Sequence, residues 1–212
     1  MSENYVPPLR FRALTPVYDW VVSWSTAERR FRQALVELVA DGDPATIVEV
    51  GCGTGSLVRL LAARHPHARL TGLDADREAL AIAASKPGNA GVTFVRGDAR
   101  ALPLRTASRD AVVTSLFFHH LDDAGKAQVL GEIRRVLRPA GRLLVGDWDA
   151  PEGLTSRIGF QAVRWLDGHA NTRAHATGEF PAILRRAGFR VEKRGRLHAL
   201  AGTLGLWEAR AQ

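Results

Sequence analysis

The chain has 212 residues, and its hydrophobic fraction of 46% and charged fraction of 24% are those of an ordinary globular protein. We therefore expect one domain with a sizeable core. No apolar run reaches the roughly 18 residues that cross a bilayer, and the N-terminus lacks a secretory signal, so a cytoplasmic location is expected. The one cysteine, Cys52, excludes an internal disulfide and a site of several thiolates, and no metal site is predicted.

The net charge of +7 raises the question of an acidic partner such as nucleic acid or an anionic membrane. Most of the charge is arginine, scattered along predicted helical faces without a basic block or an aromatic-interleaved stripe. We therefore expect no nucleic-acid partner.

Hydrophobic periodicity divides the chain into alternating helices and strands. Apolar positions at helical spacing predict a helix over residues 19–40, and a β-branched run predicts the first strand at Thr46–Val50. Further helices are expected at 56–64, 77–85, 123–137 and 179–187, and further strands at 69–73, 92–95, 110–115, 141–147, 189–197 and 199–210. The alternation predicts a doubly wound, Rossmann-like α/β sheet, mostly parallel with an antiparallel C-terminal strand and with helices on both faces.

A glycine cluster follows the first strand. The run Glu49-Val50 leads into Gly51, Gly53 and Gly55 and then into a helix. Glycine permits positive φ and close approach of a ligand, and the helix N-terminus offers free N–H groups to an anion. Tight strand-to-helix turns also use glycine for structural reasons alone.

Asp74 ends the second strand, roughly 20 residues after the glycines. A carboxylate at this place accepts hydrogen bonds from ribose hydroxyls, and the alternative is that it caps the next helix. The nicotinamide fingerprint G-x-G-x-x-G does not fit, because Gly55 comes one residue early. A dehydrogenase of similar fold is therefore only the second interpretation.

Three further motifs follow in order: Arg96–Leu104, then Asp110–Ser115 with Phe118–Leu121, and finally Glu132–Val145. With the glycines and Asp74, they resemble the class I S-adenosylmethionine-dependent methyltransferases. Within that class they are similar to the methyltransferase type 11 domain of the ubiquinone/menaquinone biosynthesis methyltransferases. The resemblance covers residues 46–147.

The resemblance implies S-adenosylmethionine as cofactor and S-adenosylhomocysteine as product. Glu49 and the glycines would line the methionine part, Asp74 would hold the ribose, and Asp98 with Ala99 would contact the adenine. The full implied set of cofactor contacts is Tyr18, Glu49, Gly51, Cys52, Gly53, Gly55, Asp74, Ala75, Asp98, Ala99, Ser115 and Leu116.

We therefore expect a single methyltransferase domain over residues 1–212. It has a helical N-terminal cap at 1–44, a cofactor-binding core at 45–148, an irregular substrate-side insertion at 149–176, and a C-terminal helix and strands at 177–212. The cap and the insertion would cover the carboxyl ends of the strands, where ligands bind in open α/β sheets.

Catalysis needs little from the protein beyond alignment of the acceptor and removal of a proton, because a sulfonium methyl is already activated. His119 and His120 are the candidate catalytic residues, since imidazole accepts a proton near neutral pH; the alternative is that they pack or bond to backbone. The insertion supplies aromatic and polar candidates for substrate binding, and the full candidate set is Phe118, Trp148, Arg157, Phe160, Trp165 and Arg173. Phe160 and Trp165 alternatively form the core of a cap helix.

The predicted function is methyl transfer to an O, N or C atom of a small-molecule acceptor, by a monomer or homodimer. Two alternatives stay open. The positive charge with Trp20 and Trp24 is also consistent with a peripheral membrane lipid methyltransferase. A non-catalytic cofactor-binding scaffold is the other, against which the intact motif argues.

Overall fold

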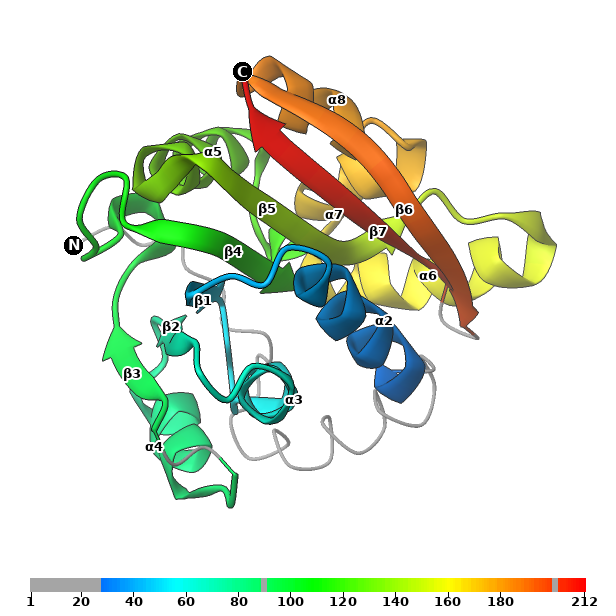
Figure 1. Cartoon of the computed structure of the whole chain (residues 1–212). Helices are drawn as coiled ribbons and strands as arrows, with labels where there is room; N and C mark the ends of the chain where they lie inside the picture. Colours follow the sequence, from blue (N-terminus) through cyan, green and yellow to red (C-terminus); the bar gives the residue numbers. More distant parts are fainter. Residues whose placement is uncertain (1–27, 89–90, 200–201) are drawn as a thin grey trace.

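The computed structural model describes residues 28–88, 91–199 and 202–212. Its centre is a seven-stranded sheet with the order β3-β2-β1-β4-β5-β7-β6 (Figure 1). The strands are β1 (Thr46–Val50), β2 (Arg69–Asp74), β3 (Thr93–Arg96), β4 (Arg109–Ser115), β5 (Leu137–Asp149), β6 (Phe189–Ala199) and β7 (Gly202–Ala211). The pairs from β3 to β5 are parallel, and β7 runs antiparallel to both β5 and β6. The predicted mostly parallel sheet with one antiparallel strand is confirmed.

Two helical layers cover the sheet, as the buried strand sequences require. Successive side chains of β1 point to opposite faces: Ile47 packs with α2 (Glu28–Ala40), α3 (Ser56–Arg64) and α6 (Gly153–Asp167). Val48 and Val50 pack with α5 (Asp123–Val136) and α8 (Phe180–Arg186) on the other face. The helix α4 (Arg77–Ser85) packs on β3 and β2.

The insertion is more regular than the sequence analysis predicts. Residues 149–176, expected to be irregular, contain α6 and most of α7 (His169–Thr177). The two helices are separated at Gly168, with φ +93°, and α7 ends at Gly178, with φ +76°. Buried Ser156, Phe160 and Val163 seat α6 on the sheet, so a helical period was present there. In the cap at 1–44, α2 is the helix within the described residues.

The site is positioned by the strand order. From β1 the chain passes outward to β2 and β3, then returns to β4 on the other side of β1 and continues to β5. Ligands bind at the carboxyl ends of strands where such an order reverses, here at the ends of β1 and β4. In the part of the chain that is described, no helix is long and apolar enough to span a bilayer.

Candidate active site

The loop after β1 is fastened to β2 and leaves one glycine facing open space. The backbone N–H groups of Gly51 and Cys52 donate to the Leu73 carbonyl at 2.8 and 3.0 Å. Gly51, Gly53 and Gly55 have φ of 73°, 50° and 74°, which side chains rarely adopt. A Cβ on Gly51 would lie 2.2 Å from the Phe117 ring, whereas one on Gly53 would meet no atom within 4 Å. Gly51 therefore serves packing as well, and a ligand can approach the backbone at Gly53.

Asp74, at the end of β2, holds this loop by a hydrogen bond. Its Oδ2 accepts the N–H of Gly53 at 2.7 Å, and its Oδ1 accepts the N–H of Asp76 at 2.9 Å. The residue that caps the next helix is Asp76 rather than Asp74, because its side chain accepts hydrogen bonds from the backbone N–H groups of Glu78 and Ala79 at the start of α4. Each Asp74 oxygen keeps a lone pair that can accept a hydrogen bond from a hydroxyl group. Burial raises the pKa of Asp74, and the backbone hydrogen bonds oppose that rise.

Glu49 lies beneath the loop as a buried carboxyl, 3% exposed. Burial raises its pKa to about 8; Arg32 and a hydrogen bond from the Val58 backbone oppose the rise, and the Asp74 charge adds to it. Its Oε2 has no hydrogen-bond partner among the described residues, and the same holds for Oγ of Ser115 at the end of β4. Unpaired buried polar atoms are rare and costly, so a polar ligand at this edge would satisfy both.

The other residues implied as cofactor contacts lie in defined structural positions. Asp98 caps the short helix η2 (Ala99–Ala101) and pairs with the Arg100 guanidinium at 2.7 Å, which lowers the pKa of Asp98. Ala99 is half-buried against the core, Ala75 is exposed beside Asp74, and the Cys52 thiol packs between α3 and α4 with its pKa raised by burial. Leu116 has φ of 52°, a strained conformation of the kind found at functional sites. Tyr18 lies outside the described residues.

The two candidate catalytic histidines belong to the short helix η3 (Phe118–His120), directly after β4. His119 Nδ1 lies 2.7 Å from Oδ1 of Asp147 on β5. The Asp147 carboxylate also accepts the N–H groups of Phe118 and Trp148, both at 2.7 Å. Burial raises the pKa of Asp147, but His119 and these bonds outweigh it and hold the pKa well below its usual range.

Asp167, the last residue of α6, faces both rings. His119 Nε2 lies 3.6 Å from its Oδ2, and His120 Nδ1 lies 3.4 Å from its Oδ1. The His119 side chain is 3% exposed and that of His120 is 22% exposed. Burial lowers the pKa of His120, with a contribution from His119, whereas the two carboxylates outweigh burial and raise the pKa of His119. A direct acid–base role stays a prediction, and His120 has the more open ring.

The six substrate-binding candidates do not meet in one cavity. Phe118 is fully buried against Phe117 and Phe180, and Trp148 packs on Phe160 with ring centroids 5.5 Å apart. Arg157 and Phe160 line a hollow of about 390 Å³ with residues of α7. Trp165 is 80% exposed on α6. Core packing was the alternative stated for both residues; the burial of Phe160 fits it, and the exposure of Trp165 does not.

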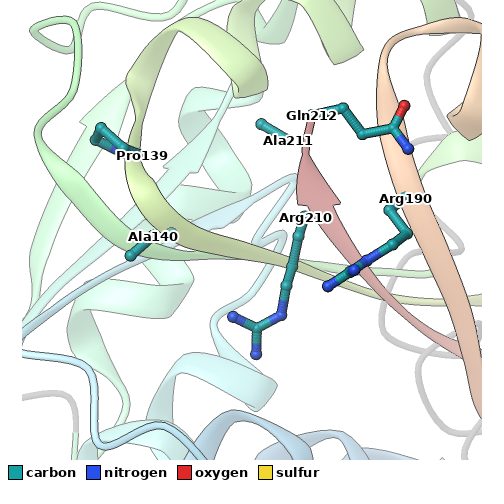
Figure 2. A pocket seen from close by; sticks show the side chains of 7 residues that line it. Pro139, Ala140, Arg190, Arg210, Ala211 and Gln212 are labelled. Atoms are coloured by element: carbon teal, nitrogen blue, oxygen red, sulfur yellow. The ribbon is translucent and has the colours of Figure 1, made fainter.

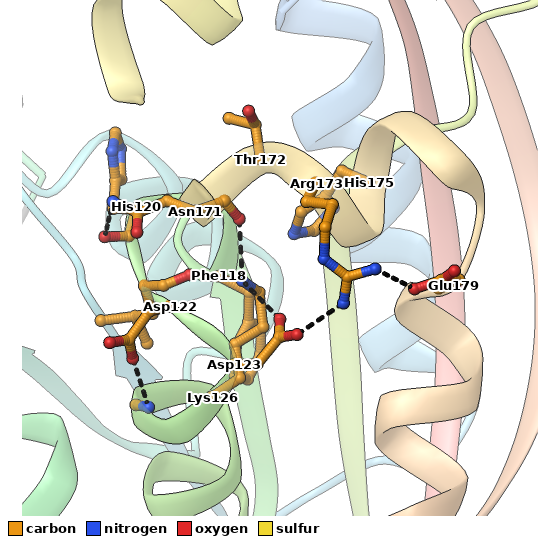
Figure 3. Close-up of polar contacts among 12 residues, drawn as sticks. Phe118, His120, Asp122, Asp123, Lys126, Asn171, Thr172, Arg173, His175 and Glu179 are labelled. Atoms are coloured by element: carbon orange, nitrogen blue, oxygen red, sulfur yellow. Dashed lines mark hydrogen bonds and ion pairs between the residues drawn. The ribbon is translucent and has the colours of Figure 1, made fainter. Parts of the chain in front are cut away.

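Arg173 fastens the insertion to the core. Its guanidinium pairs with Asp123 at 2.7 Å and with Glu179 at 2.6 Å, which joins α7 to α5 and to the segment before α8 (Figure 3). Buried Lys126 of α5 makes a second link, because its Nζ donates to the carbonyls of Leu121 and, at 2.8 Å, Asn171. These bonds hold η3 and α7 together beside the histidines.

A separate pocket of about 300 Å³ lies at the opposite end of the sheet (Figure 2). It is lined by the start of β5, by Arg190 at the start of β6, and by the end of β7, including Arg210. The glycine loop and Asp74 stand at the other ends of the parallel strands, so this pocket is no part of the candidate site.

Asp147, Asp167 and Lys126 were not predicted as parts of the site. Asp147 ends the predicted strand 141–147, and its place at the carboxyl edge was the signal available for it. Asp167 and Lys126 gave no such signal, because their positions depend on how α6 and α7 fold back over η3.

Comparison with known proteins supplies independent support. A family model described as a methyltransferase domain matches residues 47–141. A demethylmenaquinone methyltransferase of Thermus thermophilus is 37% identical over 162 residues, covering 72% of both chains. A malonyl-[acyl-carrier protein] O-methyltransferase of Hahella chejuensis is 33% identical over 134 residues, and the match spans 63% of this chain and 46% of that relative.

A solved structure shares the fold. The crystal structure of a SAM dependent methyltransferase from Aquifex aeolicus superimposes with a TM-score of 0.61 at 21% identity, covering 82% of this chain and 88% of that one.

Proposed function

The chain belongs to the class I S-adenosylmethionine-dependent methyltransferases, and we propose that the carboxyl ends of β1, β2 and β4 hold the methyl donor. The protein is an enzyme that transfers a methyl group from S-adenosylmethionine to a small-molecule acceptor. When bound, the sulfonium supplies an activated methyl group. The tasks left to the protein are to hold the donor, to align the acceptor and to exclude water.

The observation that carries the proposed donor site is the buried Glu49 carboxyl with its unpaired Oε2. We assign it to the ammonium of the donor's methionine part. The donor's carboxylate would meet the first N–H groups of α3, which no side chain caps. Asp74 would accept the ribose hydroxyls while it stays bonded to Gly53.

The other residues implied as cofactor contacts would complete the proposed donor site. Asp98 and Ala99 follow β3 at the same edge of the sheet as Asp74 and are assigned to the adenine. Ser115 and Leu116 would contact the donor from the end of β4 and Ala75 from the end of β2, and Tyr18 is assigned to the donor from the resemblance alone. Loss of the methyl group leaves neutral S-adenosylhomocysteine, which the same contacts would hold until release.

The acceptor is assigned to the edge beside η3 and α7, because the Phe117 ring before η3 packs on the donor loop at Gly51. We propose a hydroxylated aromatic ring of the hydroquinone type as acceptor. The 37% identity to a demethylmenaquinone methyltransferase supports that class.

The test is transfer of label from methyl-labelled S-adenosylmethionine to hydroquinones, phenols, carboxylic acids and amines. The proposal expects methylated hydroquinone or phenol. It also expects a kcat/KM for the donor at least about 10-fold lower in Asp74→Ala, since a lost hydrogen bond to a charged group costs about 1.5–3 kcal/mol. Donor binding without transfer to any class of acceptor would favour the scaffold alternative.

A second candidate is action on an acceptor drawn from an anionic membrane. In the sequence, this candidate function rests on the positive charge and on Trp20 and Trp24, which lie outside the described residues. The observation that favours it is on α6, where Leu154, Ile158 and Trp165 are 75%, 64% and 80% exposed. Arg157 and Arg164 lie beside them, which is the composition of an interfacial helix.

We also propose a cytoplasmic monomer or homodimer that does not bind nucleic acid. The buried free thiol of Cys52 fits a reducing compartment. Many of the arginines are engaged by carboxylates within the chain, including Arg135, Arg138 and Arg196, which reduces the basic surface available to a polyanion.

A further inference from the structure

Three side chains of metal-ligand type converge where η3 meets the end of α6. One ligand atom each from His119, His120 and Asp167 can be chosen so that all lie within 4.8 Å of one another. We propose that these residues form a binding site for a first-row divalent metal ion of the Zn²⁺ type, beside the acceptor end of the methyl-donor site. No metal site was predicted from the sequence.

The spacing of the ligand atoms fits an ion better than direct contacts. The His119–Asp167 and His120–Asp167 separations are 3.6 and 3.4 Å, longer than the roughly 2.7–3.2 Å of good hydrogen bonds. Ligands about 2.0–2.2 Å from a tetrahedral Zn²⁺ lie about 3.4 Å from one another. The two separations end on different oxygens of Asp167, and the three ligand atoms lie within 4.8 Å of one another, so the side chains would draw closer together around a cation.

Asp147 prepares His119 for this role. Its carboxylate, 2.7 Å from Nδ1, accepts a hydrogen bond from the N–H of that nitrogen in the tautomer that leaves the Nε2 lone pair facing Asp167. Metal-binding histidines commonly have a carboxylate on the far nitrogen, which fixes the ring and increases its basicity. Asp147 is itself held by the backbone N–H groups of Phe118 and Trp148.

Charge and access favour a cation as well. The carboxylates of Asp147 and Asp167 bring two negative charges to the cluster, and the Lys126 ammonium acts on Asp147 and His119 with one positive charge. The partly exposed ring of His120 gives a route from solvent.

The donor set also indicates the kind of ion. Two imidazoles and one carboxylate without a thiolate suit Zn²⁺ or Fe²⁺. Three protein ligands leave a position open, as in catalytic zinc sites. An oxygen of the acceptor could occupy that position; this role rests on the proposed function, whereas the metal site itself does not.

The test uses the full chain without a histidine tag, stripped with a chelator. Calorimetric titration with Zn²⁺ and the visible spectrum with Co²⁺ should show one ion per chain in a tetrahedral site. His120→Ala and Asp167→Asn should each weaken binding at least about 100-fold, as loss of a ligand exceeds the 10–100-fold effects of outer partners. His198→Ala, which alters an exposed histidine on β6, should bind as the wild type does.

Wild-type binding no tighter than that of His120→Ala, or no tetrahedral Co²⁺ spectrum, would overturn the metal site. If Asp167→Asn does not fold, His120→Ala decides, because its side chain is partly exposed. Titration of the same variants with S-adenosylhomocysteine separates the two proposals: they should keep donor affinity, and a wild type that fails to bind the donor would refute the donor site alone.

Discussion

Glu49 links the stability of the fold to the proposed donor site. Its pKa is about 8 in the folded chain, where burial keeps it protonated, against an ordinary value of 4.5. The folded state therefore keeps a proton that the unfolded chain loses between these two values. The stabilisation is fully present below pH 4.5 and is lost as the pH rises through about 8.

Glu49→Gln should remove this dependence. The amide stays neutral, so the stability of the variant relative to wild type should increase between pH 5.5 and 7.5 by up to about 2–3 kcal/mol, since one proton corresponds to about 1.4 kcal/mol per pH unit. Urea unfolding at both pH values without donor measures the difference. The same substitution should weaken donor binding, because the amide cannot ionise to pair with the ammonium of the donor.

Asp110→Asn is the matched control. The bonds that Asp110 accepts from Thr46 and Arg138 hold its pKa below its usual value despite burial. Its ionised form therefore stabilises the fold above the ordinary pKa, and the variant should lose stability at pH 7. Equal pH profiles for wild type and Glu49→Gln would contradict the assignment of a raised pKa to Glu49.

Residues beside the glycine motif were the most accessible to sequence reasoning. Glu49, Gly53 and Asp74 meet at one edge because each follows or ends a strand whose place is fixed by the pattern. Asp167 could not be found in this way, since its position depends on the packing of α6 rather than on its neighbours in sequence. Its role in the metal cluster appears only when η3 and α6 are seen together.

The helix α6 is apolar on two sides, which is unusual for a surface helix. Ser156, Phe160 and Val163 face the core. At 3.6 residues per turn, Leu154, Ile158 and Trp165 share the opposite side and are exposed. Large exposed apolar groups gathered on one helix mark a contact surface.

Vesicle sedimentation tests whether that surface binds anionic membranes. Wild-type protein should sediment with anionic vesicles more at low than at high salt, because salt screens the arginines. Trp165→Ser should lower the bound fraction severalfold, since it removes the largest exposed apolar group of the stripe. Ile82→Ser, which alters a 43% exposed apolar residue on α4, should have no effect. Wild-type binding equal to that of Trp165→Ser would refute the membrane candidate.

Elements with strong periodicity matched their predictions, and the insertion did not. The helices predicted at 56–64 and 77–85 have those bounds as α3 and α4. The insertion was predicted as irregular because it falls outside the alternation of helices and strands, and exposed apolar residues on α6 blur its buried stripe in the sequence. The same feature that hid the helix makes its outer side a candidate surface.

At the scale of the molecule, the strand order brings together the residues of the proposed donor site. Glu49, Asp74 and Ser115 are separated by dozens of residues, and the parallel pairs β1–β2 and β1–β4 bring their strand ends to one edge. This much followed from the alternation of helices and strands. The proposed acceptor end did not, because it is assigned to η3, α6 and α7, whose packing no sequence pattern predicted.

The most direct measurement is calorimetric titration of S-adenosylhomocysteine into wild type, Asp74→Ala and Asp76→Ala. Asp76 is a matched control, since it is a carboxylate two residues away that caps α4. Wild type and Asp76→Ala should bind one equivalent with similar affinity, and Asp74→Ala should bind at least about 10-fold more weakly, from the loss of hydrogen bonds to a charged group. Equal affinity in Asp74→Ala, or no binding by wild type, would contradict the donor site described for the ends of β1 and β2.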